Sequence, residues 1–322
     1  MKNKIMESKI RKFKNLEKWK GTLANCIRCG YCFEHCPMFH YSGWESDAPR
    51  AKLITIFGLL NGKIEPDKSA IDKIFSCFYC MRCEDACSSG VPLTQVFTDA
   101  RKDLVEFDLQ DGPGTVSTTS LQCARCLVCI NACPHDARFY DGKDISVDPL
   151  KCKSCGTCAE VCPAGAATIE KSFGTNRKDL NKRVLTFLEN NDSAKAIIFA
   201  CNWSYYPDLQ ASVLSESEEN ADKDYDILVN MCGGRLEAQL LMEPFLNNAW
   251  GVLIACCPDD ECEHKGYLNA KRQVEKLCNT FKNIGIEPER VELVQIPAGN
   301  KTMFQAKIDT FIKKLNKLGP IQ

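Results

Sequence analysis

Four cysteine runs of one spacing dominate the sequence of this 322-residue chain. Each run follows Cys-x2-Cys-x2-Cys-x3-Cys, and the runs begin at Cys26, Cys77, Cys123 and Cys152. Proline follows the last cysteine of three runs, whereas Ser88 stands in that place in the second. In this spacing the first three thiolates bind one 4Fe-4S cluster, and the fourth binds the neighbouring cluster. The chain must therefore fold so that the runs lie together in pairs.

Sharing the fourth ligand across each pair assigns sixteen cysteines to four predicted 4Fe-4S clusters. Zinc is the main alternative, because it also accepts four thiolates, but zinc modules typically show paired Cys-x2-Cys instead of triple runs. The four predicted sites are site one (Cys26, Cys29, Cys32, Cys87), site two (Cys77, Cys80, Cys83, Cys36), site three (Cys123, Cys126, Cys129, Cys162) and site four (Cys152, Cys155, Cys158, Cys133).

The 22 cysteines also bear on the compartment. Disulfide scaffolds of similar density are usually short and secreted, whereas this chain is long and begins at Met1 without the apolar core of a signal peptide. We therefore expect reduced thiols and a cytoplasmic location. No run approaches the 18 apolar residues of a membrane span, so no transmembrane segment is expected. The formal net charge of -1 gives no basic surface for nucleic acid.

Composition and turn signals divide the chain into five segments. Residues 1–20 are predicted as a basic N-terminal helix that packs on the first domain or, alternatively, docks on a partner or a membrane surface. Residues 21–110 form a helical two-cluster domain with helices at 49–60, 71–75 and 93–107. Residues 111–120 are a polar, turn-rich linker. Residues 121–175 form a compact two-cluster domain with short strands at 145–147 and 167–169, and residues 190–320 form an α/β domain.

Strand and helix patterns alternate in the C-terminal third. Buried strands are predicted at 196–200, 226–230, 251–255 and 290–296, with helices at 236–245, 267–284 and 303–315. This order predicts a parallel sheet with right-handed crossovers, in a small flavodoxin-like unit. Pro244 lies inside the first of these helices, where we expect a kink or an early end.

Cysteines follow three of these predicted strands. Cys201, Cys232 and the adjacent Cys256 and Cys257 stand at their carboxyl ends, which meet along one edge of a parallel sheet. Cys262 lies in the loop that follows. Four thiolates gathered there suit a 2Fe-2S cluster, and the alternative is a set of buried or redox thiols without metal. The remaining cysteine, Cys278, shares a helix face with apolar residues and is predicted to pack in the core. The four histidines are scattered along the sequence and are not predicted as ligands.

The two halves of the cysteine-rich region resemble different ferredoxins. Residues 123–170 resemble the bacterial two-cluster ferredoxin through Cys133-Pro and the closing Cys162-Pro-Ala-Gly-Ala-Ala-Thr-Ile. Residues 22–107 resemble the alpha-helical ferredoxin that forms the C subunit of heterodisulfide reductase. The motifs that carry this second resemblance are Cys26-Ile-Arg-Cys-Gly-Tyr-Cys-Phe-Glu-His-Cys-Pro, Pro49-Arg and Gly90-Val-Pro after the second run.

Residues 194–319 resemble the delta subunit of methyl-viologen-reducing hydrogenase. The motifs are Phe199-Ala-Cys-Asn-Trp, Met231-Cys-Gly-Gly-Arg, Gly251 to Cys262, and Gly285-Ile-Glu-Pro-Glu-Arg. The resemblance implies a 2Fe-2S cluster on Cys201, Cys232, Cys257 and Cys262. Ser204 stands where the family usually has another cysteine, and the family has Gly-Cys-His-Pro-Gly where this chain has Cys256-Cys257-Pro-Asp-Asp. These departures leave the third ligand open between Cys256 and Cys257.

The expected fold class is therefore multidomain α+β and α/β. No phosphate-binding Gly-rich loop and no acid–base constellation is recognised, so no catalytic site of its own is expected. The resemblances imply an iron–sulfur electron-transfer subunit of a cytoplasmic anaerobic heterodisulfide-reductase-type, flavin-based electron-bifurcating complex. Its expected partners are a flavoprotein resembling the A subunit of heterodisulfide reductase and a hydrogenase, formate dehydrogenase or disulfide-reducing subunit. The alternatives are a free-standing polyferredoxin carrier and an iron–sulfur sensor or scaffold.

Overall fold

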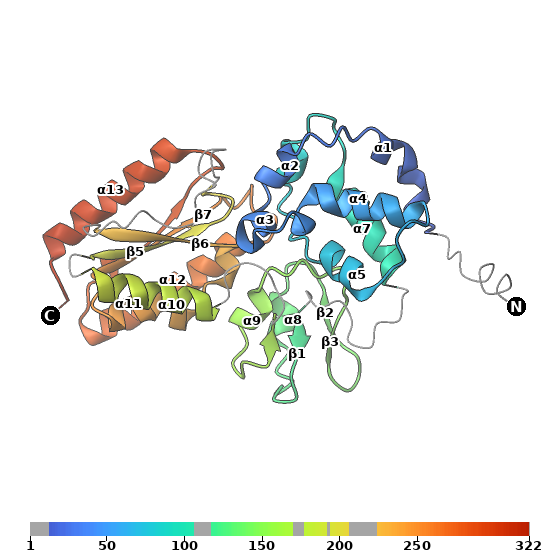
Figure 1. Cartoon of the computed structure of the whole chain (residues 1–322). Helices are drawn as coiled ribbons and strands as arrows, with labels where there is room; N and C mark the ends of the chain where they lie inside the picture. Colours follow the sequence, from blue (N-terminus) through green and yellow to red (C-terminus); the bar gives the residue numbers. More distant parts are fainter. Residues whose placement is uncertain (1–12, 106–116, 170–176, 192–193, 206–223, 322) are drawn as a thin grey trace, which may run out of the picture.

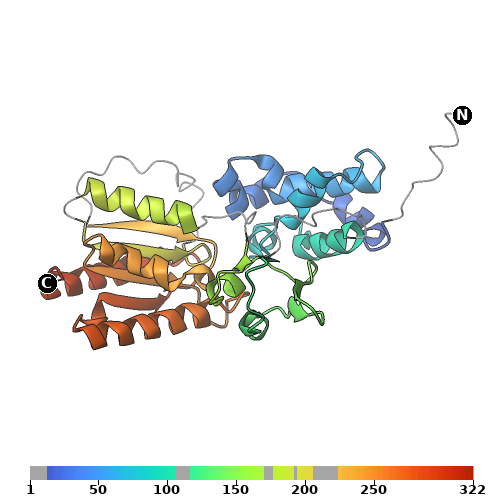
Figure 2. The ribbon, with the colours of Figure 1, turned by 90° about the horizontal axis from the view of Figure 1, so that it is seen from below.

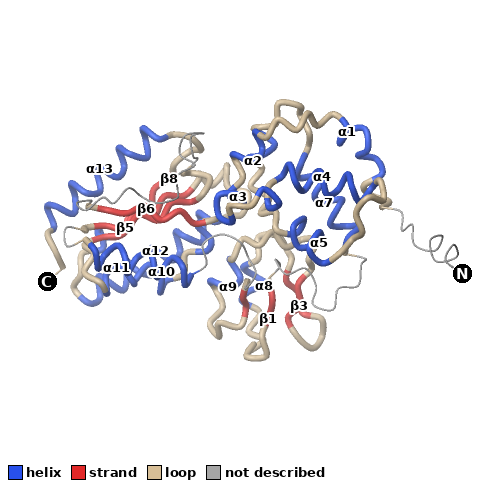
Figure 3. The backbone as a smooth tube through the Cα atoms, in the orientation of Figure 1, coloured by secondary structure: helices blue, strands red, loops and turns tan. Residues whose placement is uncertain are grey.

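A computed structural model of the protein describes residues 13–105, 117–169, 177–191, 194–205 and 224–321. Figure 1 shows a sheet domain at the C-terminal end, a helical segment toward the N-terminus, and a smaller segment with short strands below and between them. Figure 3 shows that the strands gather in the last two of these segments, while residues 13–105 are helical. Among the described residues, no helix combines the length and hydropathy needed to cross a membrane.

The first segment packs its helices around one apolar core. Asp67 caps one helix by accepting a hydrogen bond from the Ala70 amide at 2.7 Å, and Pro49 begins another, as its fixed φ favours. The elements are η1 (Glu17–Trp19), α1 (Lys20–Ala24), α2 (Tyr31–Glu34), α3 (Pro37–Ser42), η2 (Glu45–Asp47), α4 (Pro49–Leu60), α5 (Lys68–Phe75), α6 (Arg82–Asp85) and α7 (Leu93–Leu104). The three longest helices, α4, α5 and α7, supply most of the residues of this core.

The predicted N-terminal helix lies largely outside the described residues. Its described part is a turn followed by η1, and an α-helix begins only at Lys20. Asp103 of α7 fixes this segment, because its carboxylate accepts hydrogen bonds from the Asn15 amide at 3.0 Å and the Leu16 amide at 2.9 Å. These contacts at fixed backbone amides hold the chain in a turn against α7.

The second segment contains two small antiparallel pairs, β1 with β4 and β2 with β3. The predicted polar linker 111–120 needs a correction at its end, because Thr118 and Thr119 form β1 and pair with β4. The strand at 167–169 thus finds its partner in residues that the composition assigns to a linker. The elements are β1 (Thr118–Thr119), α8 (Val128–Ala132), β2 (Arg138–Tyr140), β3 (Ile145–Val147), α9 (Thr157–Glu160) and β4 (Ala167–Thr168).

The C-terminal segment holds a four-stranded, fully parallel sheet in the order β6-β5-β7-β8. Numbered from its first strand, this is the order 2-1-3-4 of flavodoxin-like sheets. The predicted parallel sheet is therefore confirmed. The elements are α10 (Arg177–Asn190), β5 (Ala196–Cys201), β6 (Tyr225–Asn230), η3 (Gly233–Arg235), α11 (Ala238–Leu246), β7 (Gly251–Cys256), α12 (Gly266–Ile284), η4 (Pro288–Arg290), β8 (Val291–Gln295) and α13 (Lys301–Leu318).

Helices cover both faces of this sheet (Figure 2). Residues of α10, α11 and α12 form one apolar layer with Ile197, Phe199 and Ile254, while α13 packs on the opposite face against Ile198 and Leu253. Successive strand residues thus point to opposite layers, which explains why the two central strands, β5 and β7, are apolar throughout. Helix α10 is missing from the predicted elements, and α11 continues through Pro244 but ends two residues later.

Candidate metal centres

The four cysteine runs share one backbone conformation. In each run the residue before the second cysteine and the residue after it have positive φ, and only two of these positions are glycine. Such angles are uncommon for other residues, so their recurrence in four loops indicates one common shape. Alternation of this kind turns successive amides inward and forms a concave nest for an anion. The residues are Arg28 and Gly30, Tyr79 and Met81, Arg125 and Leu127, and Ser154 and Gly156.

The structure brings the predicted cysteines of site one together. Burial and the neighbouring Cys26, Cys29 and Cys87 raise the pKa of Cys32 to about 12. Ser88, which replaces the usual proline, places its hydroxyl 3.7 Å from the Cys29 sulfur. The fourth cysteine thus reaches site one from the second run, as the crossed pairing requires.

Site two lies around a pocket between the two runs. Its lining contains the four cysteines predicted for this site, Cys36, Cys77, Cys80 and Cys83. Burial raises the pKa of Cys80 to about 12, because an isolated thiolate is costly there. Lys52 is buried beside this site, where Cys36 and Cys77 favour its charged form against the desolvation that lowers its pKa.

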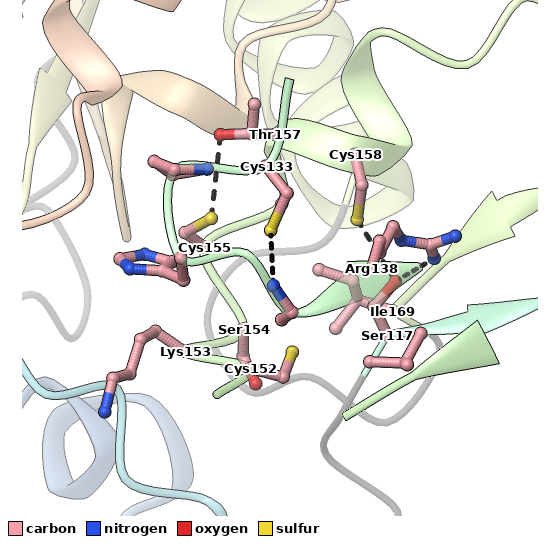
Figure 4. A pocket seen from close by; sticks show the side chains of 15 residues that line it. Ser117, Cys133, Arg138, Cys152, Lys153, Ser154, Cys155, Thr157, Cys158 and Ile169 are labelled. Carbon is pink, nitrogen blue, oxygen red and sulfur yellow. Dashed lines mark hydrogen bonds between the residues drawn. The ribbon is translucent and has the colours of Figure 1, made fainter. Parts of the chain in front are cut away.

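Sites three and four each line a pocket of their own. Figure 4 shows the pocket of site four, into which the sulfurs of Cys133, Cys152, Cys155 and Cys158 project. The second pocket is lined by the four cysteines of site three, Cys123, Cys126, Cys129 and Cys162. Each predicted set of four thus surrounds a single space, with its fourth member supplied by the partner run.

Backbone amides point at the fourth cysteine of three runs. The sulfurs of Cys87, Cys133 and Cys162 each accept a hydrogen bond from the amide four residues later, at 3.3, 3.3 and 3.2 Å. Cys262 of the C-terminal domain repeats the arrangement with the Gly266 amide at 3.1 Å. Hydrogen bonds to sulfur favour the thiolate, which is the form that binds metal.

The C-terminal cysteines meet at the carboxyl edge of the sheet. Cys201 ends β5, Cys232 follows β6, and Cys257 follows β7, whose register with β5 aligns Ala200 with Ala255. The Cys257 thiol contacts the sulfurs of both Cys201 and Cys262, and the Cys232 thiol contacts Cys262. Cys201, Cys232, Cys257 and Cys262 therefore form one connected group, which we call the C-terminal site.

Alternating donors and acceptors shift the pKa values within this site. The hydrogen bond from Cys257 lowers the pKa of Cys201 to about 7, against the effect of burial. Hydrogen bonds from Cys232 and Cys257 lower the pKa of Cys262 far below its usual range, while the pKa values of Cys232 and Cys257 rise. These hydrogen bonds favour the thiolate at Cys201 and Cys262, whereas a bound metal would deprotonate all four thiols.

Cys256 and Cys257 face different surroundings. Cys256 is 1% exposed and packs in the apolar layer beneath β7, where a Cβ placed on Gly233 would lie 2.5 Å from its sulfur. Cys257, one residue later, contacts Cys201 and Cys262 instead. The geometry therefore groups Cys257 with the other three cysteines. Cys278 packs against the same apolar layer and donates to the Pro288 carbonyl at 3.5 Å.

Two histidines and one arginine near the sites are not identified by sequence reasoning. His135 and His264 contact each other at 3.2 Å although 129 residues separate them, so two of the four histidines that are scattered in the sequence form a pair in the fold. Arg138 is 3% exposed and donates to the Cys129 sulfur at 3.7 Å, while the Cys158 charge also stabilises its protonated form. The histidine contact joins residues that are distant in the chain, so the local sequence does not indicate it.

Trp203 donates to Glu261 at 3.4 Å at the rim of the C-terminal site. Within the described ranges, no group of three or more His, Cys, Asp or Glu side chains is arranged to hold a single metal ion. The four nest-shaped runs, the pockets and the amides directed at sulfur are instead features that fit an anionic iron–sulfur cluster.

Comparison with known proteins finds family matches in three parts of the chain. Residues 196–319 match the family described as methyl-viologen-reducing hydrogenase, delta subunit. Residues 22–91 match a 4Fe-4S dicluster domain, and residues 121–141 and 145–168 match 4Fe-4S binding domains. The chain thus joins ferredoxin-type 4Fe-4S domains to a hydrogenase delta-subunit domain, which confirms the fusion predicted from the motifs.

Curated relatives share parts of the chain. The iron-sulfur D subunit of the F420-non-reducing hydrogenase of Archaeoglobus profundus is 31% identical over 128 residues, 39% of this chain and 91% of that relative. The A subunit of the ferredoxin:CoB-CoM heterodisulfide reductase of Methanosarcina mazei is 31% identical over 126 residues, 39% of this chain. The probable glycolate oxidase iron-sulfur subunit of Bacillus subtilis is 37% identical over 83 residues, 26% of this chain.

The fold and the cysteine sites define an iron–sulfur protein of the ferredoxin class, related to subunits of heterodisulfide reductase and hydrogenase. Through its C-terminal domain, the chain belongs to the methyl-viologen-reducing hydrogenase delta subunit family. The match spans only 16% of the heterodisulfide reductase relative and 19% of the glycolate oxidase relative.

Proposed function

We propose that this chain is the electron-transferring iron–sulfur subunit of a heterodisulfide-reductase-type complex. Sites one to four would each hold a 4Fe-4S cluster, and the C-terminal site would hold a 2Fe-2S cluster. When bound, such clusters supply one-electron oxidation and reduction. The observation that carries the proposal is that five groups of four cysteines lie in one chain, each group gathered from segments that are distant in sequence.

The residues between neighbouring sites support a continuous path. Cys32 of site one is close enough to Cys83 of site two to disfavour the charged form of that thiol. In the second segment, the Arg138 guanidinium lies between Cys129 of site three and Cys158 of site four. These contacts keep adjacent sites close and place a fixed positive charge between two of them.

Two of the sites reach the surface. Cys29 of site one is exposed and is flanked by Ile27 and Tyr31, which are 68% and 53% exposed. Cys126 of site three is exposed beside the exposed Leu127. Exposed apolar side chains that gather in a patch are typical of protein docking surfaces. We infer that partner proteins exchange electrons with the chain at these two ends.

The relatives suggest the partners. One relative is named as the A subunit of heterodisulfide reductase, another as the D subunit of a hydrogenase, and a third as an F420-dependent formate dehydrogenase subunit beta. By analogy, this chain would relay electrons between a flavoprotein and a hydrogenase, formate dehydrogenase or disulfide-reducing subunit. Flavin-based bifurcation would take place on the flavoprotein, since no flavin-binding motif is recognised in this sequence.

Strictly anoxic co-purification of the tagged full chain from its native cells tests this function. The proposal predicts a flavoprotein partner in fixed ratio and reduction of the chain by that partner's substrate. Cys257→Ser should leave the partner bound but slow electron transfer through the C-terminal site, whereas Cys278→Ser should change neither. Recovery of the chain as an isolated monomer would instead support a free-standing carrier.

A further inference from the structure

Site two, site four and the C-terminal site meet at one apolar junction. Phe78 and the side chains of Met38 and Met231 pack there in a single buried cluster. One cysteine of each site belongs to the same cluster, namely Cys36 of site two, Cys155 of site four and Cys232 of the C-terminal site. Three segments that follow one another in sequence thus bring one ligand each to a common centre.

A buried arginine connects site two with site four. Arg101 of α7 is 1% exposed and donates to the Cys77 carbonyl at 2.7 Å. The same guanidinium approaches the Cys152 carbonyl at 3.5 Å. It therefore joins the first cysteine of the second run to the first cysteine of the fourth run.

Two more arginines, one half-buried and one fully buried, connect the C-terminal site with site four and with site two. Arg235, three residues after Cys232, donates to the Ser154 carbonyl in the loop of site four at 2.6 Å. Arg82, which is 0% exposed and lies between two cysteines of site two, donates to Asn202 Oδ1 at 2.6 Å. Asn202 directly follows Cys201. Each pair among the three sites is thus joined by one guanidinium.

The arginines suit three anionic centres held close together. A 4Fe-4S core bound by four thiolates carries a net charge of roughly -2, so neighbouring loaded sites repel each other. A guanidinium stays protonated when buried and donates in several directions at once. A positive charge at each contact offsets this repulsion and fixes the loops in place. Sites one and three lie outside the junction, at the two exposed ends.

We propose that the C-terminal site is a branch point that exchanges electrons directly with both site two and site four. This rests on the proposed function, because it requires loaded sites. A strictly linear arrangement would connect the C-terminal site to only one ferredoxin module. Each transfer moves one electron, which oxidises the donor site and reduces the acceptor site by one, with no bond made or broken. The electrons come from the flavoprotein partner, or from dithionite in a reconstituted sample.

Pulsed EPR on the full chain, reconstituted anoxically and reduced with dithionite, tests the branch point. In the unmodified protein the C-terminal centre should show dipolar coupling to two reduced neighbours. Cys155→Ser, which removes a ligand of site four, should abolish one coupling and leave the other. Cys80→Ser at site two should have the complementary effect, and the control Cys278→Ser should keep both couplings.

If one of the two variants, Cys155→Ser or Cys80→Ser, abolishes all coupling to the C-terminal centre while the other abolishes none, the path is linear. That result would overturn the branch point. A single neighbour in the unmodified protein would overturn it as well, even where a variant fails to fold. These outcomes leave the proposed function standing, because the C-terminal signal is present. Absence of a 2Fe-2S signal from the unmodified chain would overturn both proposals.

Discussion

Substituting the adjacent Cys256 and Cys257 separately should have opposite consequences. Cys257 contacts Cys201 and Cys262, so Cys257→Ser should weaken the C-terminal site. Four 4Fe-4S clusters and one 2Fe-2S cluster contain about 18 iron atoms per chain, and loss of the C-terminal cluster leaves about 16. Because the Cys257 side chain lies outside the apolar layer, we expect little change in the stability of the sheet domain.

Cys256→Ser should instead lower stability and leave the iron content near 18. The Cys256 side chain lies in an apolar layer and is 1% exposed, so a serine hydroxyl there could not form hydrogen bonds with water. Burying a hydroxyl without a hydrogen-bond partner costs about 1 to 3 kcal/mol by protein mutational data. Anoxic iron analysis and urea unfolding of both variants provide the two readouts. Loss of two iron atoms from Cys256→Ser, with none lost from Cys257→Ser, would refute the assignment of the ligand.

Three further changes test the surrounding structure. Arg101→Leu leaves the buried carbonyls of Phe75 and Cys77 without their hydrogen-bond donor, at a cost of about 1 to 3 kcal/mol each. Chemical unfolding should therefore show the first segment destabilised by about 2 to 6 kcal/mol. Unchanged stability would contradict this. Arg138→Gln should make the reduction potential of site three more negative in an EPR-monitored titration, and by more than the exposed, Asp144-paired Arg125→Gln. Burial opposes ionisation of Asp99, but hydrogen bonds from Lys102, Lys18 and Trp19 prevail and lower its pKa to about 2. This stabilisation is complete above the unfolded pKa of about 4 and disappears as pH falls toward 2, so Asp99→Asn should destabilise the protein at pH 7 and converge with the unmodified protein in acid.

Much of the fold follows from local patterns in the sequence. The 49–60 helix and the parallel strands are found where periodicity predicts them, because long apolar segments leave few alternatives. Helix α10 is missing from the prediction although Leu180, Val184, Phe187 and Leu188 follow helical spacing and pack in the apolar layer, so periodicity alone could have identified it. Strand β1 is missed because two threonines carry no pattern until β4 lies beside them.

The candidate sites also combine features that the sequence predicts with features that only the folded chain shows. The crossed sets of cysteines follow from spacing, because the motif itself fixes which fourth residue joins which three. The junction does not follow from spacing. Arg235 stands out in the sequence only as the end of the motif Met231-Cys-Gly-Gly-Arg, beside a predicted ligand, and nothing in the sequence indicates that Arg82 and Arg101 contact other sites. The roles of these three arginines depend on tertiary contacts across 51 to 120 residues, and only the folded chain reveals them. The same holds for the pair of His135 and His264.

Anoxic reductive titration of the purified full chain, with iron and sulfide measured on the same sample, tests the central claim most directly. Five one-electron centres predict uptake of about five electrons per chain, with about 18 iron atoms and both 4Fe-4S and 2Fe-2S signals in EPR. A chain that contains zinc in place of iron, or that takes up no electrons when fully loaded, would contradict the account.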